Sequence, residues 1–229
     1  MKKILLSLLL YTIAWSSHAA IVIYGTRVIY PAEHKEISVQ LNNHSDKASL
    51  IQAWIDNGDP HIPPEEMDVP FLLMPPIATI AAGNGQQLRI RVLPNTLPVD
   101  RESVFYLNVL DIPPHNPANS ANQLKLAMQN RIKLFYRPPG IHSLDEKTFA
   151  QVFARRSPKG IQLDNRSPHH ITITTLSMGE KKQLLTQTIM LAPFSQQPIA
   201  GTMVIHAPSV TLTYLDDYGV KRQQDILIN

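Results

Sequence analysis

Residues 123–138 read QLKLAMQNRIKLFYRP, and apolar side chains occupy most of the even-numbered positions. These alternating residues are Leu124, Leu126, Met128, Ile132, Leu134 and Tyr136. Because successive side chains of a β-strand point to opposite faces, the pattern predicts a long, half-buried strand. Its other face would carry Arg131, Lys133 and Arg137, with no acidic residue in the stretch to neutralise them. The strand is therefore either an ordinary core strand of a sandwich or a surface for an extended, apolar partner with one negative charge.

The composition of the whole chain favours β-structure. The 229 residues include 19 prolines and only 9 glycines, spread between short segments rich in Val, Ile, Thr, Leu and Tyr. Such segments are typical of strands. About seven strands are expected before residue 138, the number found in an immunoglobulin-like sandwich. Two of them are predicted over residues 21–31 and 71–80, and the glycines of AAGNGQQ suit a hairpin turn.

A second all-β half follows the short, stiff segment RPPGI at residues 137–141. Two prolines in five residues indicate a connection between domains. We therefore expect an N-terminal domain over residues 20–138 and a C-terminal domain over residues 142–229. The strand signals of the second half begin with residues 149–154.

The N-terminus has the pattern of a cleavable secretory signal. Lys2 and Lys3 precede an apolar run that ends at Ala14, and small residues follow. The run is too short for a membrane span, so we predict a signal peptide over residues 1–19, with cleavage after Ala19 or Ala20. The remaining chain would have 19 basic and 18 acidic residues. This near balance gives no reason to expect nucleic acid as a partner, or insertion into a membrane.

No catalytic or metal-binding pattern stands out. The chain has no cysteine, which excludes thiolate chemistry and a disulfide framework. Nucleophile elbows, phosphate-binding glycine loops and HExxH motifs are also missing from the sequence. His169 and His170 are adjacent and would point to opposite faces of a strand, which disfavours joint metal ligation. We expect no enzyme activity, no cofactor and no metal.

Five segments occur in an order that resembles one protein family. They are GTRVIYP at residues 25–31, QAWIDN at 52–57, LPVDRESVFYLNVLDIPP at 97–114, RIKLFYRP at 131–138 and LDDYG at 215–219. Together they resemble the periplasmic pilus chaperones of the chaperone/usher pathway, which are PapD-like. The resemblance implies two immunoglobulin-like β-sandwich domains in a boomerang arrangement, with a cleft that binds a pilus subunit. The short connection at 115–122 is similar to the branch of the family with a short F1-G1 loop.

The resemblance also implies how a subunit is bound. Leu124, Leu126 and Met128 would fill an open groove of the subunit as a donated strand, a form of strand addition. Arg27 and Lys133 would bind the subunit's C-terminal carboxylate in the cleft between the domains. The family then delivers the subunit to an outer-membrane usher. The donated strand is an apolar edge, so self-association of the free protein is a possibility.

A third group of residues is implied to set the angle between the domains. Glu102, Arg137 and Asp217 match the family's buried ionic network at the domain interface, a role that is structural. The alternative to a periplasmic chaperone is an immunoglobulin-like fimbrial subunit or surface adhesin. A subunit is expected to be one incomplete domain, often with a disulfide, whereas this sequence predicts two domains and contains no cysteine.

Overall fold

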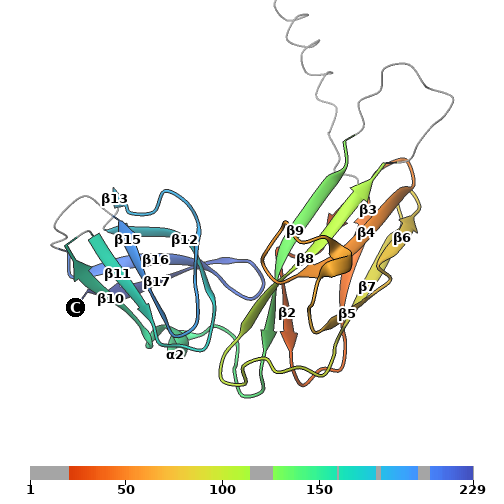
Figure 1. Cartoon of the computed structure of the whole chain (residues 1–229). Helices are drawn as coiled ribbons and strands as arrows, with labels where there is room; N and C mark the ends of the chain where they lie inside the picture. Colours follow the sequence, from red (N-terminus) through yellow and green to blue (C-terminus); the bar gives the residue numbers. More distant parts are fainter. Residues whose placement is uncertain (1–20, 114–125, 159, 179–181, 201–206, 229) are drawn as a thin grey trace, which may run out of the picture.

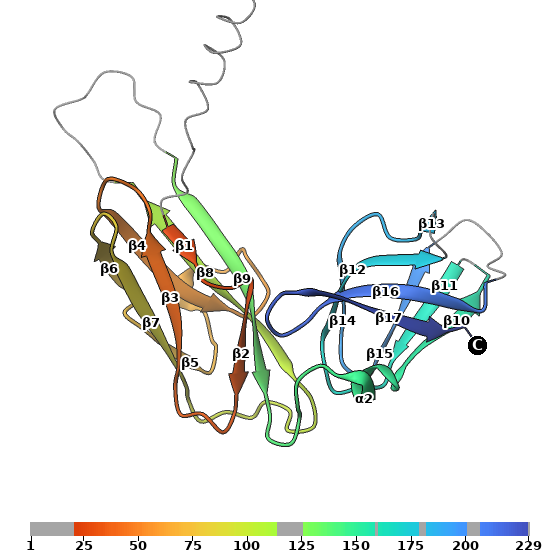
Figure 2. The same ribbon diagram turned by 180° about the vertical axis from the view of Figure 1, so that it is seen from behind.

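The computed structural model describes residues 21–113, 126–158, 160–178, 182–200 and 207–228. It confirms the all-β prediction: two immunoglobulin-like sandwiches lie next to each other at an angle (Figures 1 and 2). The predicted signal peptide and Leu124 lie outside the described residues. Within the described part of the chain, no helix is long and apolar enough to cross a membrane.

The first sandwich consists of two sheets. One has the strand order β1 (Ile21–Ile23), β3 (Ile37–Asn43), β7 (Gly85–Val92) and β5 (Phe71–Met74). The other has the order β2 (Arg27–Pro31), β9 (Met128–Arg137), β8 (Ser103–Ile112), β4 (Ser49–Asp56) and β6 (Ile77–Ile80). Neighbouring strands are antiparallel, except that β2 and β9 run parallel. The parallel pair joins segments that are about a hundred residues apart in sequence.

The core of this sandwich forms where the inner faces of the two sheets meet. Leu41, Leu107 and Leu134 are completely buried there. Phe71 and Phe105 pack edge to face, with 4.9 Å between their ring centroids. Burial of alternate residues on each strand leaves the other residues of the same strands outside, and this fixes which side chains of β9 face solvent or the second sandwich.

Two strands predicted as continuous are each divided between the two sheets. Residues 21–31 form β1 and β2, because Gly25 has a φ of 103°, a conformation that side chains other than glycine rarely adopt. Residues 71–80 form β5 and β6. Pro75 and Pro76 lie between these strands and have no N–H to donate to a ladder. The chain therefore crosses from one sheet to the other at both points.

The second sandwich also has two sheets. The smaller one has the order β10 (Val152–Ser157), β11 (Gly160–Asn165) and β15 (Ser195–Ala200). The larger has the order β13 (Lys182–Gln183), β12 (Ile171–Met178), β16 (Ser209–Leu215) and β17 (Lys221–Leu227), with β14 (Ile189–Leu191) also paired to β12. Its separate core includes Leu163, Ile173 and Leu212.

Short helical turns occur outside the sheets. One is the 3-10 turn η1 (Pro64–Glu66). The other, α2 (Glu146–Phe149), replaces the start of the strand predicted over residues 149–154, so that β10 begins only at Val152. Asp145 caps α2, because its side chain accepts a hydrogen bond from Thr148 N at 2.9 Å. A cap of this kind favours the helical conformation locally.

Replacement of a core leucine should destabilise the protein strongly. We expect Leu107→Ala to lower the free energy of unfolding by about 2 to 5 kcal/mol, since it leaves a cavity. The control is Leu227→Ala, at a side chain that is 72% exposed, with an expected change of about 0.5 kcal/mol or less. Urea unfolding followed by circular dichroism measures both, and similar losses in the two variants would contradict the assigned core.

Candidate functional site

The parallel pairing of β2 with β9 brings two cations to one place between the sandwiches. Arg27 lies directly opposite Lys133 in the register, so both side chains point to the same side of the sheet. Arg27 Nη1 donates to Leu215 O at 3.2 Å, and Lys133 Nζ donates to Thr172 Oγ1 at 3.3 Å. Both acceptors belong to the second sandwich. The structure therefore brings together the two cations that the sequence resemblance selected.

The electrostatic setting of these cations is unfavourable. Arg27 is only 9% exposed, and burial lowers its pKa despite the charges of Asp217, Asp216 and Glu102. Burial also lowers the pKa of Lys133, and the nearby charge of Arg27 adds to this effect. Among the described residues neither cation forms an ion pair, and Arg27 Nε is buried without a hydrogen-bond partner. An anion placed between them would stabilise the charged forms of both.

The first part of β9 has an open edge. β2 pairs only with residues from Lys133 to Arg137, whereas β8 pairs with β9 from Met128 onward. Residues 128–132 therefore have a neighbouring strand on one side, and no strand of the described chain on the other. Their free backbone N–H and C=O groups form the kind of edge to which another strand can pair.

The exposed apolar residues of the candidate site lie at this end of β9. Leu126 and Met128 are 65% and 63% exposed, while Leu124 is outside the described residues. Ile132, Leu134 and Tyr136 have the same parity but belong to the core of the first sandwich. The alternating pattern therefore covers both an exposed apolar surface, at Leu126 and Met128, and part of the core of the first sandwich.

The strand itself is shorter than the predicted one over residues 123–138. β9 begins at Met128, which pairs with Asp111 near the end of β8. Leu126 and Ala127 precede the strand, and the ladder between β8 and β9 begins with the pair Asp111 and Met128. The pattern of side chains extends past the point where hydrogen bonding by β8 stops.

Arg131 has an acidic partner from another strand, although the stretch 123–138 itself contains no acidic residue. Its guanidinium donates to both carboxylate oxygens of Asp56 on β4, at 2.8 and 2.6 Å, and lies over the Tyr106 ring. Burial alone would raise the pKa of Asp56, but hydrogen bonds from Arg131 and Asn108 lower it below its usual value. The neutralising acid lies in the segment QAWIDN, which is distant in sequence, and no local pattern predicted its pairing with Arg131.

Arg137 connects the two sandwiches through a buried ionic network. Its Nε donates to Glu102 Oε1 at 2.8 Å, and its two terminal nitrogens donate to Asp217 at 2.7 and 2.8 Å. The other oxygen of Glu102 accepts from the backbone N of His170 at 2.8 Å. Burial raises the pKa of Glu102, but the contacts with His170 and the charge of Arg137 outweigh it, and the pKa lies below its usual value.

Further contacts at the junction had no signal in the sequence. Glu102 N donates to Pro168 O at 2.9 Å, and the guanidinium of Arg101 lies 4.8 Å from the centre of the Phe194 ring. Thr172, which holds Lys133, is 2% exposed. Each joins residues from different sandwiches, and no local pattern marks such a pair.

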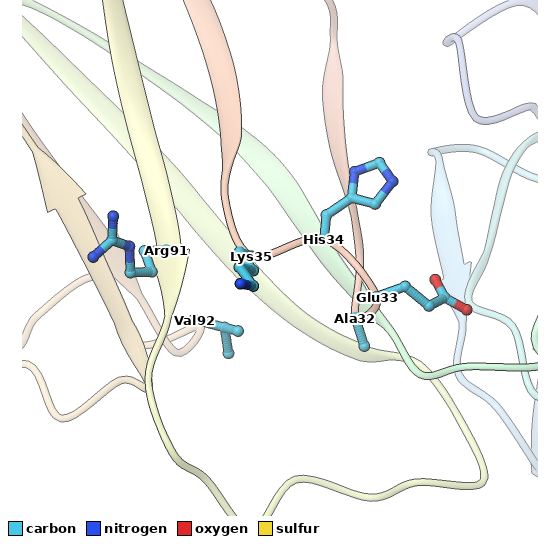
Figure 3. A pocket seen from close by; sticks show the side chains of 6 residues that line it. All are labelled: Ala32, Glu33, His34, Lys35, Arg91 and Val92. Atoms are coloured by element: carbon cyan, nitrogen blue, oxygen red, sulfur yellow. The ribbon is translucent and has the colours of Figure 1, made fainter.

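A surface hollow at the far end of β2 is not a comparable site. Its lining consists of Ala32, Glu33, His34, Lys35, Arg91 and Val92. The side chains of Arg91 and Glu33 point in opposite directions and do not converge (Figure 3). Among the described residues no group of three His, Cys, Asp or Glu side chains is arranged to hold a metal ion.

Loss of the Glu102 charge should destabilise the protein in a way that depends on pH. Because the folded pKa is depressed, the stability that Glu102 contributes is present above its ordinary pKa of 4.5 and is lost as the pH falls through the lower folded value. We expect Glu102→Gln to cost about 3 kcal/mol at pH 7, as when a buried ion pair loses one partner. The difference from the wild type should shrink toward pH 3.

Urea unfolding between pH 3 and pH 7 measures this difference. Glu36→Gln is the control, because Glu36 contacts Arg89 and Arg91 in exposed ion pairs. Its effect should be about 1 kcal/mol or less. A difference between Glu102→Gln and the wild type that stays constant over the whole pH range would contradict the assignment.

Comparisons with known proteins agree with this geometry. Residues 20–142 match the PapD N-terminal domain of pili and flagellar-assembly chaperones, and residues 148–226 match the PapD C-terminal domain of pili assembly chaperones. The chain is 49% identical over 218 residues to the probable fimbrial chaperone YehC of Escherichia coli strain K12, which covers 95% of this chain and 90% of that protein.

Solved structures give the same result. The CupB2 chaperone of Pseudomonas aeruginosa is 30% identical, with a TM-score of 0.78 over 91% of this chain and 100% of that one. A structure of the Salmonella enterica SafA pilin in complex with the SafB chaperone shares the fold, with a TM-score of 0.77, 20% identity, and coverage of 93% of this chain and 98% of that one. This chain therefore belongs to the PapD-like fimbrial chaperones of the chaperone–usher pathway, a family of chaperones and not of enzymes.

Proposed function

We propose that this protein is a periplasmic chaperone that binds pilus subunits and delivers them to an outer-membrane usher. The observation that carries the proposal is a pair of cations, the buried Arg27 and the partly buried Lys133. They lie on the strand pair whose continuation is an open edge with exposed apolar side chains. The SafB chaperone, which shares the fold, has been solved with a pilin, and this supports a pilin as the partner.

The cations suit a terminal carboxylate. Arg27 and Lys133 are neighbours, partly desolvated, and held by neutral oxygens of the second sandwich. One carboxylate could accept from both, and charged hydrogen bonds of this kind contribute about 1.5 to 3 kcal/mol each. The buried Arg27 Nε has no hydrogen-bond partner among the residues that the structure describes, which supports a site completed by a ligand.

The open edge suits an incomplete sandwich. A subunit that lacks its last strand could pair with the backbone of residues 128–132, while Leu124, Leu126 and Met128 fill its groove. Full burial of three such side chains contributes about 1.5 to 3 kcal/mol each, before the costs of association. Methionine is the most adaptable of the three, which suits a chaperone that serves several subunits.

The carboxylate anchor and the donated strand act together. The anchor lies at Lys133, and the apolar residues precede it at fixed spacing along the same chain. Binding of the subunit's end at Lys133 therefore sets the register in which the apolar side chains meet their pockets. Without this anchor, a strand could slip by two residues and still present an apolar face.

The remaining assignments concern the chain as a whole. We propose that Glu102, Arg137 and Asp217 hold the angle between the domains, which extend over residues 20–138 and 142–229. Residues 1–19 would direct export and be removed. In the free protein the open edge could pair with a second copy, which would protect it until a subunit arrives.

Loss of either cation should reduce capture of a subunit. We expect Lys133→Ala and Arg27→Ala to lower recovery of a co-expressed fimbrial subunit by about tenfold or more, because each removes a charged hydrogen bond. Co-purification from periplasm measures recovery. Lys47→Ala, at an exposed lysine, is the control with no expected change. Folded variants that recover the subunit as well as the wild type would exclude this mechanism, and protein found polymerised on the cell surface would favour a structural subunit.

Loss of the exposed apolar residues should have a separate effect. We expect Leu126→Ser and Met128→Ser each to reduce subunit recovery by about tenfold, since each removes a side chain that the subunit would bury. Leu227→Ser changes a leucine of similar exposure, 72%, in the second sandwich and should leave recovery unchanged. The same assay measures all three, and equal losses would mean that exposed apolar surface in general, and not the donated strand, binds the subunit.

A further inference from the structure

The turn between β16 and β17 contacts the first sandwich next to the cation pair. In both views the tip of this hairpin reaches the paired strands β2 and β9 (Figures 1 and 2). Leu215 O accepts a hydrogen bond from Arg27 Nη1 at 3.2 Å. Two residues later, the Asp217 carboxylate accepts hydrogen bonds from both terminal nitrogens of Arg137. The turn therefore supplies a hydrogen bond to Arg27, whose guanidinium also lies 5.8 Å from the centre of the Phe135 ring.

Hydrogen bonds within the turn make it rigid. Gly219 N donates to Asp216 O at 2.9 Å, and Asp216 Oδ1 accepts from Tyr218 N at 3.0 Å and from Val220 N at 2.8 Å. Gly219 has a φ of 78°, the left-handed conformation that follows a tight turn in many hairpins. These bonds connect Gly219 to Asp216, the residue that follows Leu215 in the chain.

Gly219 lies against Thr26, the residue that precedes Arg27. A Cβ atom at Gly219 would overlap the Thr26 hydroxyl oxygen. Gly140 offers a comparison within the same chain, because its φ is 84° but a Cβ atom there would meet nothing within contact distance. The close approach at Gly219 is therefore a steric contact between the sandwiches, in addition to the preference of the turn for glycine.

The second cation has its own support. Thr172 on β12 accepts from Lys133, and Thr172 is almost completely buried. Arg27 and Lys133 are thus held by two different elements of the second sandwich. The distance between the cations depends on how each element is seated on the first sandwich.

We infer that Gly219 and Thr26 are positioning residues of the carboxylate site: their contact seats the turn so that Leu215 O can hold Arg27 beside Lys133. The inference rests on the proposed function, since it assigns the geometry of the same anchor. Neither residue carries a charge, and neither needs to touch the ligand. The affinity for a carboxylate should therefore respond to the packing of an uncharged glycine.

The test compares variants of two glycines that have similar positive φ angles, 78° at Gly219 and 84° at Gly140. The ligand is a synthetic 12-residue peptide of alternating apolar and polar residues with a free C-terminal carboxylate. This peptide and the same peptide with a C-terminal amide are each titrated into the protein, and calorimetry measures the two affinities. We expect Gly219→Ala to weaken binding of the carboxylate peptide about tenfold, as on loss of a charged hydrogen bond, and to leave amide binding unchanged. Gly140→Ala should bind both peptides as the wild type does.

The variant Thr26→Ala distinguishes loss of the contact between Gly219 and Thr26 from a general loss of folding. It removes the hydroxyl without adding bulk, and we expect a loss of carboxylate affinity of about two- to threefold. The double variant Gly219→Ala/Thr26→Ala should bind like Thr26→Ala, since the overlap is relieved. If Gly219→Ala does not fold, Thr26→Ala still decides: an unchanged preference for carboxylate over amide overturns the inference.

The pKa of Lys133 gives a readout that a merely structural role would not move. Arg27 contributes to the lowered pKa of Lys133, so withdrawal of Arg27 in Gly219→Ala should raise that pKa, whereas Gly140→Ala should leave it unchanged. A ¹³C-lysine NMR titration measures the shift. Glycine variants that give equal Lys133 pKa values and equal affinities overturn the inference.

A further variant separates the two proposals. If Arg27→Ala binds the carboxylate and amide peptides equally well while the wild type prefers the carboxylate, the proposed anchor stands. The behaviour of Gly219→Ala then tests the inference alone. If the wild type shows no preference for the carboxylate, the proposed anchor itself fails.

Discussion

Two like charges held side by side in a partly buried seam are the constraint on which the rest of this structure depends. The parallel register between β2 and β9 places Arg27 opposite Lys133, and no described acidic side chain forms an ion pair with either. Burial and mutual repulsion both oppose this arrangement. Such a pair persists only when the surrounding fold holds it, and groups held at a cost in stability concentrate at functional sites.

The outward face of β9 shows how selectively charge is neutralised. Arg131, Lys133 and Arg137 lie on this face, with Phe135 between the last two, and each arginine has a carboxylate partner. Arg131 contacts Asp56 within the first sandwich, and Arg137 contacts Glu102 and Asp217 across the junction. Lys133, between them, donates to the hydroxyl of Thr172 and forms no ion pair within the described part of the chain. Of these three cations, the one without a described acidic partner is the one that faces Arg27.

The inward face of the same strand is divided in a different way. Leu134 is completely buried, whereas Leu126 and Met128 of the same parity are exposed, because β9 extends past the end of its own core. One alternating pattern thus contributes to the stability of the first sandwich and, in the proposed function, to binding of a subunit. The change from exposed to buried side chains occurs near Lys133. From this residue onward β2 pairs with β9, and before it this edge of β9 is open.

The sequence alone determined much of this protein. Alternation in residues 123–138 predicted a strand, the absence of cysteine and of catalytic motifs excluded several classes, and five ordered segments indicated the family and selected Arg27, Lys133 and Arg137. These inferences depend on local patterns, which follow from the period of a strand and from short motifs.

The contacts between segments that are distant in the sequence became known only from the tertiary structure. The pairing of Arg131 with Asp56, the support of Lys133 by Thr172, and the seat of Gly219 on Thr26 each connect strands or turns far apart in the chain. The division of residues 21–31 between two sheets was also missed, because a period-two pattern does not reveal where a glycine turns the chain from one sheet to the other. The local sequence pattern indicates on which face of a strand a side chain lies. The residues that this face contacts are determined by tertiary packing.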